Sequence, residues 1–229
     1  MRTIIFDIET SSYPFETLAE SQKEYILRYA EKEKSADLRN QKREEAIRYT
    51  SLYPFTAEVI AIGIFDVEKE KSFVYFSDPS GEEWSCDEKK IQYKGVTEEK
   101  MLTSFWRIVD IADRVVTFNG KSFDAPFLML RSALLKVQPS KNLVGRRYNN
   151  TFHIDLLEQF TYSGLTRKFN LDFYCTSFGI ESPKSKGITG MDVKTLYEAG
   201  RVKDIAVYCG EDINATYRLF NIWNEYLNI

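Results

Sequence analysis

Residues 2–8 read RTIIFDI, a run of β-branched and aromatic residues that reaches an aspartate near its end. Because such side chains favour the extended backbone, the run predicts a buried strand over Arg2–Ile8. Asp7 lies near the end of this strand, and Glu9 follows two residues later. Since side chains alternate between the faces of a strand, we expect both carboxylates to share one face. Two acids at this spacing usually mark no more than a solvated strand end, so this motif alone does not indicate a functional site.

The segments that follow predict a sheet built onto this strand. Glu58–Phe65 (EVIAIGIF) and Ser72–Phe76 (SFVYF) are β-rich runs joined by a charged turn, which indicates an antiparallel pair. Thr97 precedes a helix-like stretch with an acid-rich first turn, and the short strand Arg114–Phe118 (RVVTF) comes after it. A strand, a helix and a further strand imply a crossover connection.

The second half of the chain is predicted to be mainly helical. Expected helices cover Ser122–Lys136, Thr151–Phe160, Asn170–Phe178, Asp192–Ala199 and Asp204–Tyr226. Pro126 is acceptable in the first turn of its helix, where its missing N–H costs little. Early strands, one crossover and late helices favour an α/β fold with a mixed sheet.

Phe15–Tyr53 contains no Gly or Pro and is dominated by Glu, Lys, Arg, Ala and Gln, which predicts helices. Its apolar positions form only a thin stripe, so we expect it to contact the body along one edge. The length of 229 residues fits a single domain over residues 1–229, with this charged helical insertion at about 15–53.

Composition narrows the possible chemistry. The three cysteines are far apart and one histidine is present, which excludes cysteine-rich zinc clusters and mechanisms that need two imidazoles. No stretch approaches the ~18 continuous apolar residues of a membrane span, and no leader-like segment precedes the first strand. We therefore expect a cytoplasmic protein that does not enter membranes. The net charge of −3 does not by itself indicate a nucleic-acid binder.

The stretch FNGKSFDAPFL at residues 118–128 supplies a second acidic motif. Asp124 follows the strand RVVTF and begins a helix, so it reaches the edge that carries Asp7 if the two strands are neighbours. An aspartate there is equally expected as a helix N-cap. Asn119 and Lys121 could contact a phosphate or sugar, or make hydrogen bonds within a turn.

The stretch YCGEDINATYRL at residues 208–219 supplies a third motif. Tyr208 and Asp212 are four residues apart on a predicted helix, about 5–6 Å from each other on one face. The plainer interpretation is an amphipathic helix with a partly buried tyrosine and a solvated aspartate. Glu211 lies roughly 100° around the helix from Asp212, so both acids cannot enter one site equally.

Taken in order, FDIET, NGKSFD and YCGED resemble the three exonuclease motifs of the DEDD superfamily, in its tyrosine-bearing DEDDy branch. The chain also resembles predicted 3′-5′ exonucleases related to the proofreading domain of family B DNA polymerases, as do its phrases HIDLL, FGIE and ATYRL. The resemblance implies a ribonuclease H-like fold, with a mixed five-stranded sheet flanked by helices. It does not lead us to expect the helical insertion after the first strand.

The resemblance also implies a site and a reaction. The catalytic residues would be Asp7, Glu9, Asp124, Tyr208 and Asp212. The four acids would hold two divalent cations, Mg²⁺ or Mn²⁺, with Asp7 bridging them. Glu9 and Asp212 would hold the cation that binds the attacking water, Asp124 would act on the other through water, and Tyr208 would orient the nucleophile. Two cations can stabilise the attacking and leaving oxygens of phosphodiester hydrolysis.

The expected partner is nucleic acid, cut from its 3′ end, with DNA favoured and single-stranded or frayed ends preferred. Candidate substrate-binding residues are Thr10, Asn119, Lys121, Phe123, Arg146 and Arg147. Lys141 with Arg146 and Arg147, and Lys184 with Lys186, are basic clusters that fit either a nucleic-acid backbone or ordinary solvated charge. We expect Asp155 to support a metal ligand or to cap a helix, with direct metal binding as the lesser alternative, and we expect His153 to be a structural residue. The alternatives are a catalytically silent nucleic-acid-binding module and a structure-specific endonuclease.

Overall fold

A computed structural model describes residues 1–145, 150–181, 189–190 and 192–229. The described residues form one seven-stranded sheet in the order β4-β5-β3-β2-β1-β6-β7. The strands are β1 (Thr3–Ser12), β2 (Ala57–Asp66), β3 (Lys71–Ser77), β4 (Glu83–Cys86), β5 (Ile91–Val96), β6 (Arg114–Thr117) and β7 (His153–Asp155). β1 pairs antiparallel with β2 and parallel with β6, so the sheet is mixed as predicted.

The expectation of five strands is corrected to seven among the described residues. The run β3-β2-β1-β6-β7 forms the ribonuclease H-like sheet, and β4 and β5 extend it beyond β3. β5 pairs parallel with β3 and alternates buried and exposed residues, since one of its faces meets solvent. Its sequence IQYKGV is therefore too polar to be recognised as a buried strand.

A second correction concerns Thr151–Phe160, which was expected to be helical throughout. His153–Asp155 forms β7, an edge strand that pairs in parallel with β6, and helix α5 (Leu156–Phe160) starts directly after it. The available edge of β6 accounts for this difference, because backbone pairing there competes with helix formation. The other helices agree with prediction to within a few residues: α3 (Glu98–Asp110), α4 (Asp124–Leu134), α6 (Leu171–Ser177), α7 (Val193–Glu198) and α8 (Val202–Tyr226).

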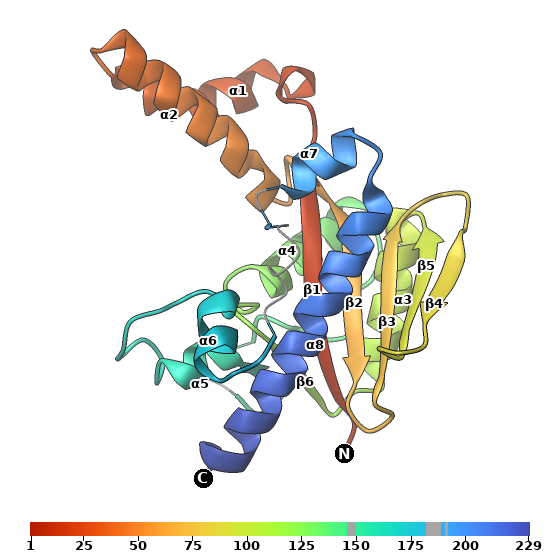
Figure 1. Cartoon of the computed structure of the whole chain (residues 1–229). Helices are drawn as coiled ribbons and strands as arrows, with labels where there is room; N and C mark the ends of the chain where they lie inside the picture. The colour runs from red at the N-terminus through yellow and green to blue at the C-terminus, as the bar shows by residue number, and fades with distance from the viewer. Residues whose placement is uncertain (146–149, 182–188, 191) are drawn as a thin grey trace.

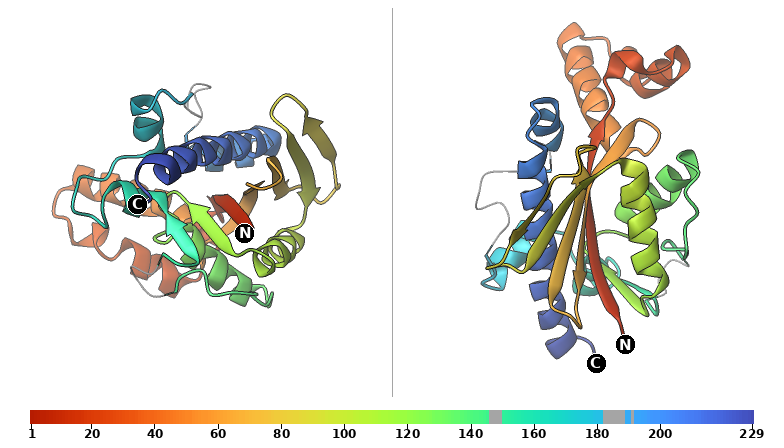
Figure 2. Two further views of the ribbon diagram at one scale, coloured as in Figure 1. Left: turned by 90° about the horizontal axis from the view of Figure 1, so that it is seen from below. Right: turned by 90° about the vertical axis from the view of Figure 1, so that its right-hand side faces the viewer.

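Helices cover both faces of the sheet (Figures 1 and 2). α3 and α4 lie on one face, where their apolar side chains join Ile4, Phe6 and Ile8 in a buried core. α8 crosses the opposite face and packs on a second core that includes Ile5 and Ala61. β1 therefore buries its even-numbered residues against α3 and α4 and turns its odd-numbered residues toward α8.

The insertion between β1 and β2 projects beyond the end of the sheet (Figure 1). It comprises η1 (Phe15–Thr17), α1 (Glu20–Leu27), η2 (Ala30–Lys32), α2 (Ala36–Arg48) and η3 (Tyr49–Leu52). None of the residues that make up α1 and α2 is buried. Within the described part of the chain, every helix is too short or too polar to cross a lipid bilayer.

Gly63 on β2 brings α8 into direct contact with the sheet. It pairs with Asp7 in the β1–β2 register. A Cβ atom at Gly63 would lie 2.8 Å from Ile213 Cγ2 and 2.9 Å from Cys209 Sγ, closer than side-chain atoms normally approach. The missing side chain thus lets α8 lie directly over the pair formed by Asp7 and Gly63.

Replacing Gly63 by alanine should push α8 away from the sheet and lower the free energy of unfolding by about 1–3 kcal/mol, the usual cost of overpacking a core. Urea unfolding followed by circular dichroism measures this change. Gly190→Ala is the matched control, because a Cβ atom there meets nothing within 4 Å. Equal stability of Gly63→Ala and the wild-type protein would show that α8 does not depend on this close approach.

Candidate metal centre

Asp7 and Glu9 continue the face of β1 that buries Ile5 against α8. Their carboxylate oxygens and the Cys209 sulfur of α8 all lie within 4.8 Å of one another. The register between β1 and β2 shifts directly after Glu9, as in a β-bulge, a feature found often beside functional sites. The two acids predicted to share a face therefore do so, and this face is covered by α8.

Asp124 joins the site because β6 is shorter than β1. Ile5 pairs with Val116, and β6 ends one residue later at Thr117. The backbone N–H of Ile8 therefore has no strand partner on that side and donates instead to Asp124 Oδ1 at 3.0 Å. Asp124 is the first residue of α4, so a strand end and a helix start bring its carboxylate beside β1.

Asp155 holds the loop that delivers Asp124. Its Oδ1 accepts the backbone N–H of Asn119 at 2.8 Å, and its Oδ2 accepts that of Lys121 at 3.0 Å. Oδ1 also accepts the N–H of Leu157 and so caps α5. The expected role of Asp155 as a helix cap is present, and the same carboxylate fixes the loop between β6 and α4.

Tyr208 and Asp212 enter from α8, one helical turn apart. Both side chains are buried, with 7% and 8% of their surface exposed. The Tyr208 hydroxyl hydrogen-bonds the Asp212 carboxylate, as the four-residue spacing allows. Cys209, between them, donates its S–H to the backbone carbonyl of Asp7 at 3.9 Å. The segment YCGED of α8 therefore brings Tyr208, Cys209 and Asp212 to the side of the helix that covers β1.

Burial and mutual repulsion dominate the electrostatics of the carboxylates. The pKa of Asp7 is raised well above its usual value by burial and then by Asp124, Glu9 and Asp212. Burial and the charge of Asp212 raise the pKa of Glu9, and burial raises the pKa of Asp124 to about 7. Burial is the largest cause in all three acids, and the charges of neighbouring aspartates and glutamates add to it. Without a cation, the cluster therefore holds its negative charge at a cost in free energy.

This donor set fits hard divalent cations. Carboxylate oxygens are the ligands that Mg²⁺ and Mn²⁺ prefer, and two positive charges would offset the repulsion within the cluster. The Cys209 thiol is a poorer ligand for such ions, and burial next to the acids raises its pKa, so it stays protonated. Asp7, Glu9, Asp124 and Asp212 are the residues that could hold a metal, with Cys209 as a packing neighbour.

The predicted substrate-binding residues have varied surroundings. The Thr10 hydroxyl donates to the Ser51 carbonyl at 2.7 Å, next to Glu9. Lys121 Nζ pairs with Glu158 at 2.9 Å, so its charge already has a partner. Phe123 packs against the core on the α3–α4 face, 5.7 Å from the ring of Phe127. Arg146, Arg147, Lys184 and Lys186 lie outside the described residues.

Asn119 takes the left-handed backbone conformation, with φ of 65°, at the start of the loop. The next residue, Gly120, has no room for a side chain, since a Cβ atom there would lie 2.4 Å from Thr117 Oγ1. The backbone of this turn is thus strongly constrained. Its role in substrate binding stays a prediction.

The remaining candidates have structural partners. Glu211 forms an ion pair with Lys89 at 3.0 Å. His153 is buried between the Leu143 carbonyl at Nδ1 and the Thr117 hydroxyl at Nε2, and burial lowers its pKa to about 4. His153 is therefore neutral and part of the core, as the sequence suggested.

Sequence reasoning missed the contributions of Gly63 and Cys209 to this centre. A glycine inside the β-rich run EVIAIGIF is a recognised sign of close backbone approach, so a signal for Gly63 was present. Cys209 carries no comparable signal, because an isolated buried cysteine is common in cores.

The central strand, the crossing helix and the carboxylates between them define a ribonuclease H-like domain with a 3′-5′ exonuclease fold. Residues 58–226 match a family described as predicted 3′-5′ exonucleases related to the exonuclease domain of PolB, and this chain belongs to that family. The matched range includes Asp124, Tyr208 and Asp212 but begins after β1 and the insertion.

Comparison with individual proteins agrees with this family. The chain is 28% identical to a DNA polymerase of Desulfurococcus sp. (strain Tok) over 143 residues, which cover 54% of this chain and 18% of the polymerase. It is 29% identical to a DNA polymerase of Thermococcus sp. (strain GE8), covering 54% of this chain and 8% of that protein. This chain therefore matches less than a fifth of the length of either polymerase.

A solved structure shows the same fold over nearly the whole chain. The structure of the family B DNA polymerase from the hyperthermophilic archaeon Pyrobaculum calidifontis superimposes with a TM-score of 0.61 and 16% identity. The match covers 98% of this chain and 24% of the polymerase chain. At this identity the likeness describes the fold, in which the exonuclease-like sheet is only part of a much larger protein.

The stability of the metal-free protein should fall as the pH rises. The folded-state pKa values of Asp7, Glu9 and Asp124 lie above those of the unfolded chain, with Asp124 at about 7. The folded state therefore binds more protons between about pH 4 and pH 7, and the free energy of unfolding decreases across that range. In EDTA, the thermal midpoint should be lower at pH 8 than at pH 5.5, and Asp124→Asn should flatten this dependence.

Adding Mn²⁺ or Mg²⁺ should raise the thermal midpoint, and by more at pH 8 than at pH 5.5, because cations bind ionised ligands. Differential scanning fluorimetry with and without metal measures both effects. Asp7→Asn should reduce the gain, since Asp7 interacts with the three other acids. An unchanged midpoint on adding metal at pH 8 would contradict the assignment of a metal centre.

Proposed function

We propose that this chain is a metal-dependent 3′-5′ exonuclease that hydrolyses phosphodiester bonds at the 3′ end of nucleic acid. The observation that carries the proposal is the meeting of acids from β1, α4 and α8 beside a buried tyrosine, Tyr208. The family match to predicted 3′-5′ exonucleases supports the same activity. The relatives named above are DNA polymerases, which favours DNA over RNA as the substrate.

Each acid has a role that follows from its position. The charges of Glu9, Asp124 and Asp212 all raise the pKa of Asp7, so Asp7 lies among the other acids and would help to hold both cations. The charge of Asp212 on α8 also raises the pKa of Glu9 on β1, and these two acids would hold one cation together. Asp124, oriented by the Ile8 N–H, would act on the other. When bound, Mg²⁺ or Mn²⁺ would stabilise the attacking and leaving oxygens of the reaction.

Tyr208 would act through the hydrogen bonds of its hydroxyl. Burial and the charges of Asp212, Glu9 and Asp7 raise its pKa well above the ordinary value of tyrosine, so the hydroxyl stays protonated at neutral pH. A protonated phenol cannot serve as a base, and its one O–H is donated to Asp212, but its oxygen can still accept a hydrogen bond from a water molecule and hold that water in place. The hydrogen bond to Asp212 fixes the direction of the ring, which makes Tyr208 suited to orienting the nucleophile.

Single-stranded or frayed 3′ ends are the preferred substrates in this proposal, because only an unpaired end can place its terminal bond against acids that are nearly buried. Asp124 and Asp212 expose 3% and 8% of their surfaces. One nuclease assay distinguishes the proposed exonuclease from the two alternatives, a catalytically silent binding module and a structure-specific endonuclease.

Asp7→Ala and Asp212→Ala should each abolish hydrolysis while leaving the fold intact, because each removes a cation ligand. The assay follows a 5′-labelled single-stranded DNA with Mg²⁺ or Mn²⁺, which the wild-type protein should shorten progressively from the 3′ end. Glu211→Ala is the matched control, since Glu211 adjoins Asp212 in sequence but pairs with Lys89. It should retain activity.

Three results would contradict the proposal. Full activity of either aspartate variant would remove the site from the reaction. Cleavage of circular or 3′-blocked DNA would indicate the endonuclease, and binding of DNA without metal-dependent cleavage would indicate the silent module.

Tyr208→Phe should slow turnover by roughly 10²-fold while leaving metal binding unchanged, since one positioned hydrogen-bonding group typically contributes on this scale. The phenylalanine keeps the ring and removes only the hydroxyl. Single-turnover rates at saturating Mn²⁺, compared with the metal-dependent shift in the thermal midpoint, separate the two effects. A rate equal to that of the wild-type protein would show that the hydroxyl has no part in the reaction.

A further inference from the structure

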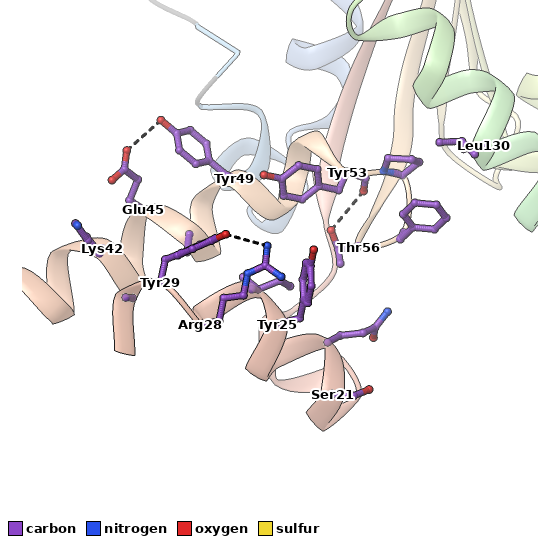
Figure 3. A pocket seen from close by; sticks show the side chains of 16 residues that line it. Ser21, Tyr25, Arg28, Tyr29, Lys42, Glu45, Tyr49, Tyr53, Thr56 and Leu130 are labelled. Carbon is purple, nitrogen blue, oxygen red and sulfur yellow. Dashed lines mark hydrogen bonds between the residues drawn. The ribbon is translucent and has the colours of Figure 1, made fainter. Parts of the chain in front are cut away.

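The insertion forms a large aromatic pocket at the end of the sheet (Figure 3). Its volume is about 1020 Å³, at the upper end of the ~300–1,000 Å³ typical of ligand pockets. Four tyrosines and a phenylalanine line it: Tyr25 and Tyr29 from α1 and its C-terminal turn, Tyr49 and Tyr53 from η3 and the residue after it, and Phe55.

The rings of this pocket are unusually exposed for a folded protein. Tyr25, Tyr29 and Phe55 expose 65%, 63% and 56% of their surfaces. Packing contributes little to the stability of α1 and α2, because none of the residues of these two helices is buried. Contiguous exposed apolar surface of this kind marks a binding site.

A guanidinium group lies among the rings. The Arg28 Cζ atom is 3.6 Å from the ring centroid of Tyr25 and 4.7 Å from that of Tyr29 (Figure 3). Among the ion pairs of the described residues none involves Arg28. Lys42, which lines the pocket from α2, instead pairs with Glu33. Glu45, the one carboxylate among the described residues of the lining, already accepts the hydroxyl of Tyr49 at 3.1 Å. Exposed aromatic rings with a cation that has no ion-pair partner among the described residues are complementary to bases joined by phosphates.

The elements that form the pocket are joined to those that carry the candidate metal centre. Thr10, next to Glu9 on β1, donates its hydroxyl to the carbonyl of Ser51 in η3, between the pocket residues Tyr49 and Tyr53. Leu130 lines the pocket from α4 and lies six residues after Asp124, which is about 9 Å along the helix axis. These two links place the pocket near the acids that would receive a 3′ end.

We infer that this pocket binds the single-stranded nucleic acid just upstream of its 3′ end, with bases stacked on the tyrosines and Arg28 near a phosphate. The inference rests on the proposed function for the direction of the strand, and it gives the helical insertion a role in substrate binding. Stacking on an aromatic side chain contributes about 1–3 kcal/mol per base and tolerates any sequence, which suits an enzyme that removes nucleotides in succession.

The test compares a labelled 12-nucleotide single strand with a 3-nucleotide strand. Binding is measured by fluorescence anisotropy in EDTA, where metal-dependent cleavage cannot occur. The double variant Tyr25→Ala/Tyr29→Ala should weaken binding of the 12-mer by roughly tenfold or more, the scale of one lost stack. In the presence of metal, its KM for the 12-mer should rise while kcat, and the kinetics on the 3-mer, stay unchanged.

Two further variants distinguish stacking from other causes. Tyr25→Phe/Tyr29→Phe keeps both rings and should restore the affinity, which a general loss of fold would not allow. Tyr226→Ala is the matched control, since Tyr226 is 66% exposed at the end of α8, and this end of the helix is remote from the insertion (Figure 1). The control variant should bind the 12-mer as the wild-type protein does. Circular dichroism checks that each variant is folded.

The outcomes separate this inference from the exonuclease assignment. Cleavage of the 12-mer with unaltered affinity in the double alanine variant would overturn the inference and leave the exonuclease intact. Pocket-dependent binding without metal-dependent cleavage would support the pocket and overturn the exonuclease. Failure of the wild-type protein to bind the 12-mer would overturn the inference. So would a dimer that the alanine variant abolishes without any change in affinity for the strand, which would assign the pocket to a second copy of this chain.

Discussion

Repulsion among carboxylates that the fold buries together is the constraint on which this structure depends. β1 lies in the middle of the sheet, so Asp7 and Glu9 occupy positions where the strand would otherwise continue an apolar face. Asp124 and Asp212 approach the same place from two helices, and each adds to the cost of ionising the others. An arrangement of this kind is stable at neutral pH when positive charge is supplied, and a pair of divalent cations supplies it most directly. Burial thus makes the cluster unfavourable by itself and favourable as a metal centre.

The approach of α8 sets how closely these groups can gather. Gly63 removes a side chain beside Asp7, and the small Cys209 fills the space between helix and strand. A longer residue at either position would separate Tyr208 and Asp212 from β1. The loop before α4 is fixed in a similar way, because Asp155 holds its backbone and Gly120 leaves room for Thr117. Neither Gly63 nor Asp155 needs to touch a substrate, yet both determine where the acids lie.

The central part of this arrangement could be predicted from sequence because short-range periodicity controls it. The two-residue spacing of Asp7 and Glu9 and the four-residue spacing of Tyr208 and Asp212 fix faces without any knowledge of the tertiary fold. β5 and β7 were missed because pairing with a neighbouring strand, rather than their own polar sequences, makes them strands. The partner of Lys121 was also invisible, since Glu158 is 37 residues away in the chain. Local spacing predicts which residues face one another, whereas long-range partners require the fold.

The insertion lies outside the residues that match the family, and its position explains how it can act on the same reaction. The family match begins at residue 58, after the insertion has returned to the sheet. Its last turn, η3, is nevertheless bonded to Thr10 beside Glu9, and its pocket reaches α4, which begins at Asp124. The charges of residues 15–53 balance, so the insertion offers no general attraction for phosphates, and its exposed rings, together with Arg28 among them, must provide the affinity. Binding through stacking is also less sensitive to salt than binding through charge, because few counterions are released when bases stack. A site built this way can hold a strand whose phosphates the acidic metal centre, without its cations, would repel.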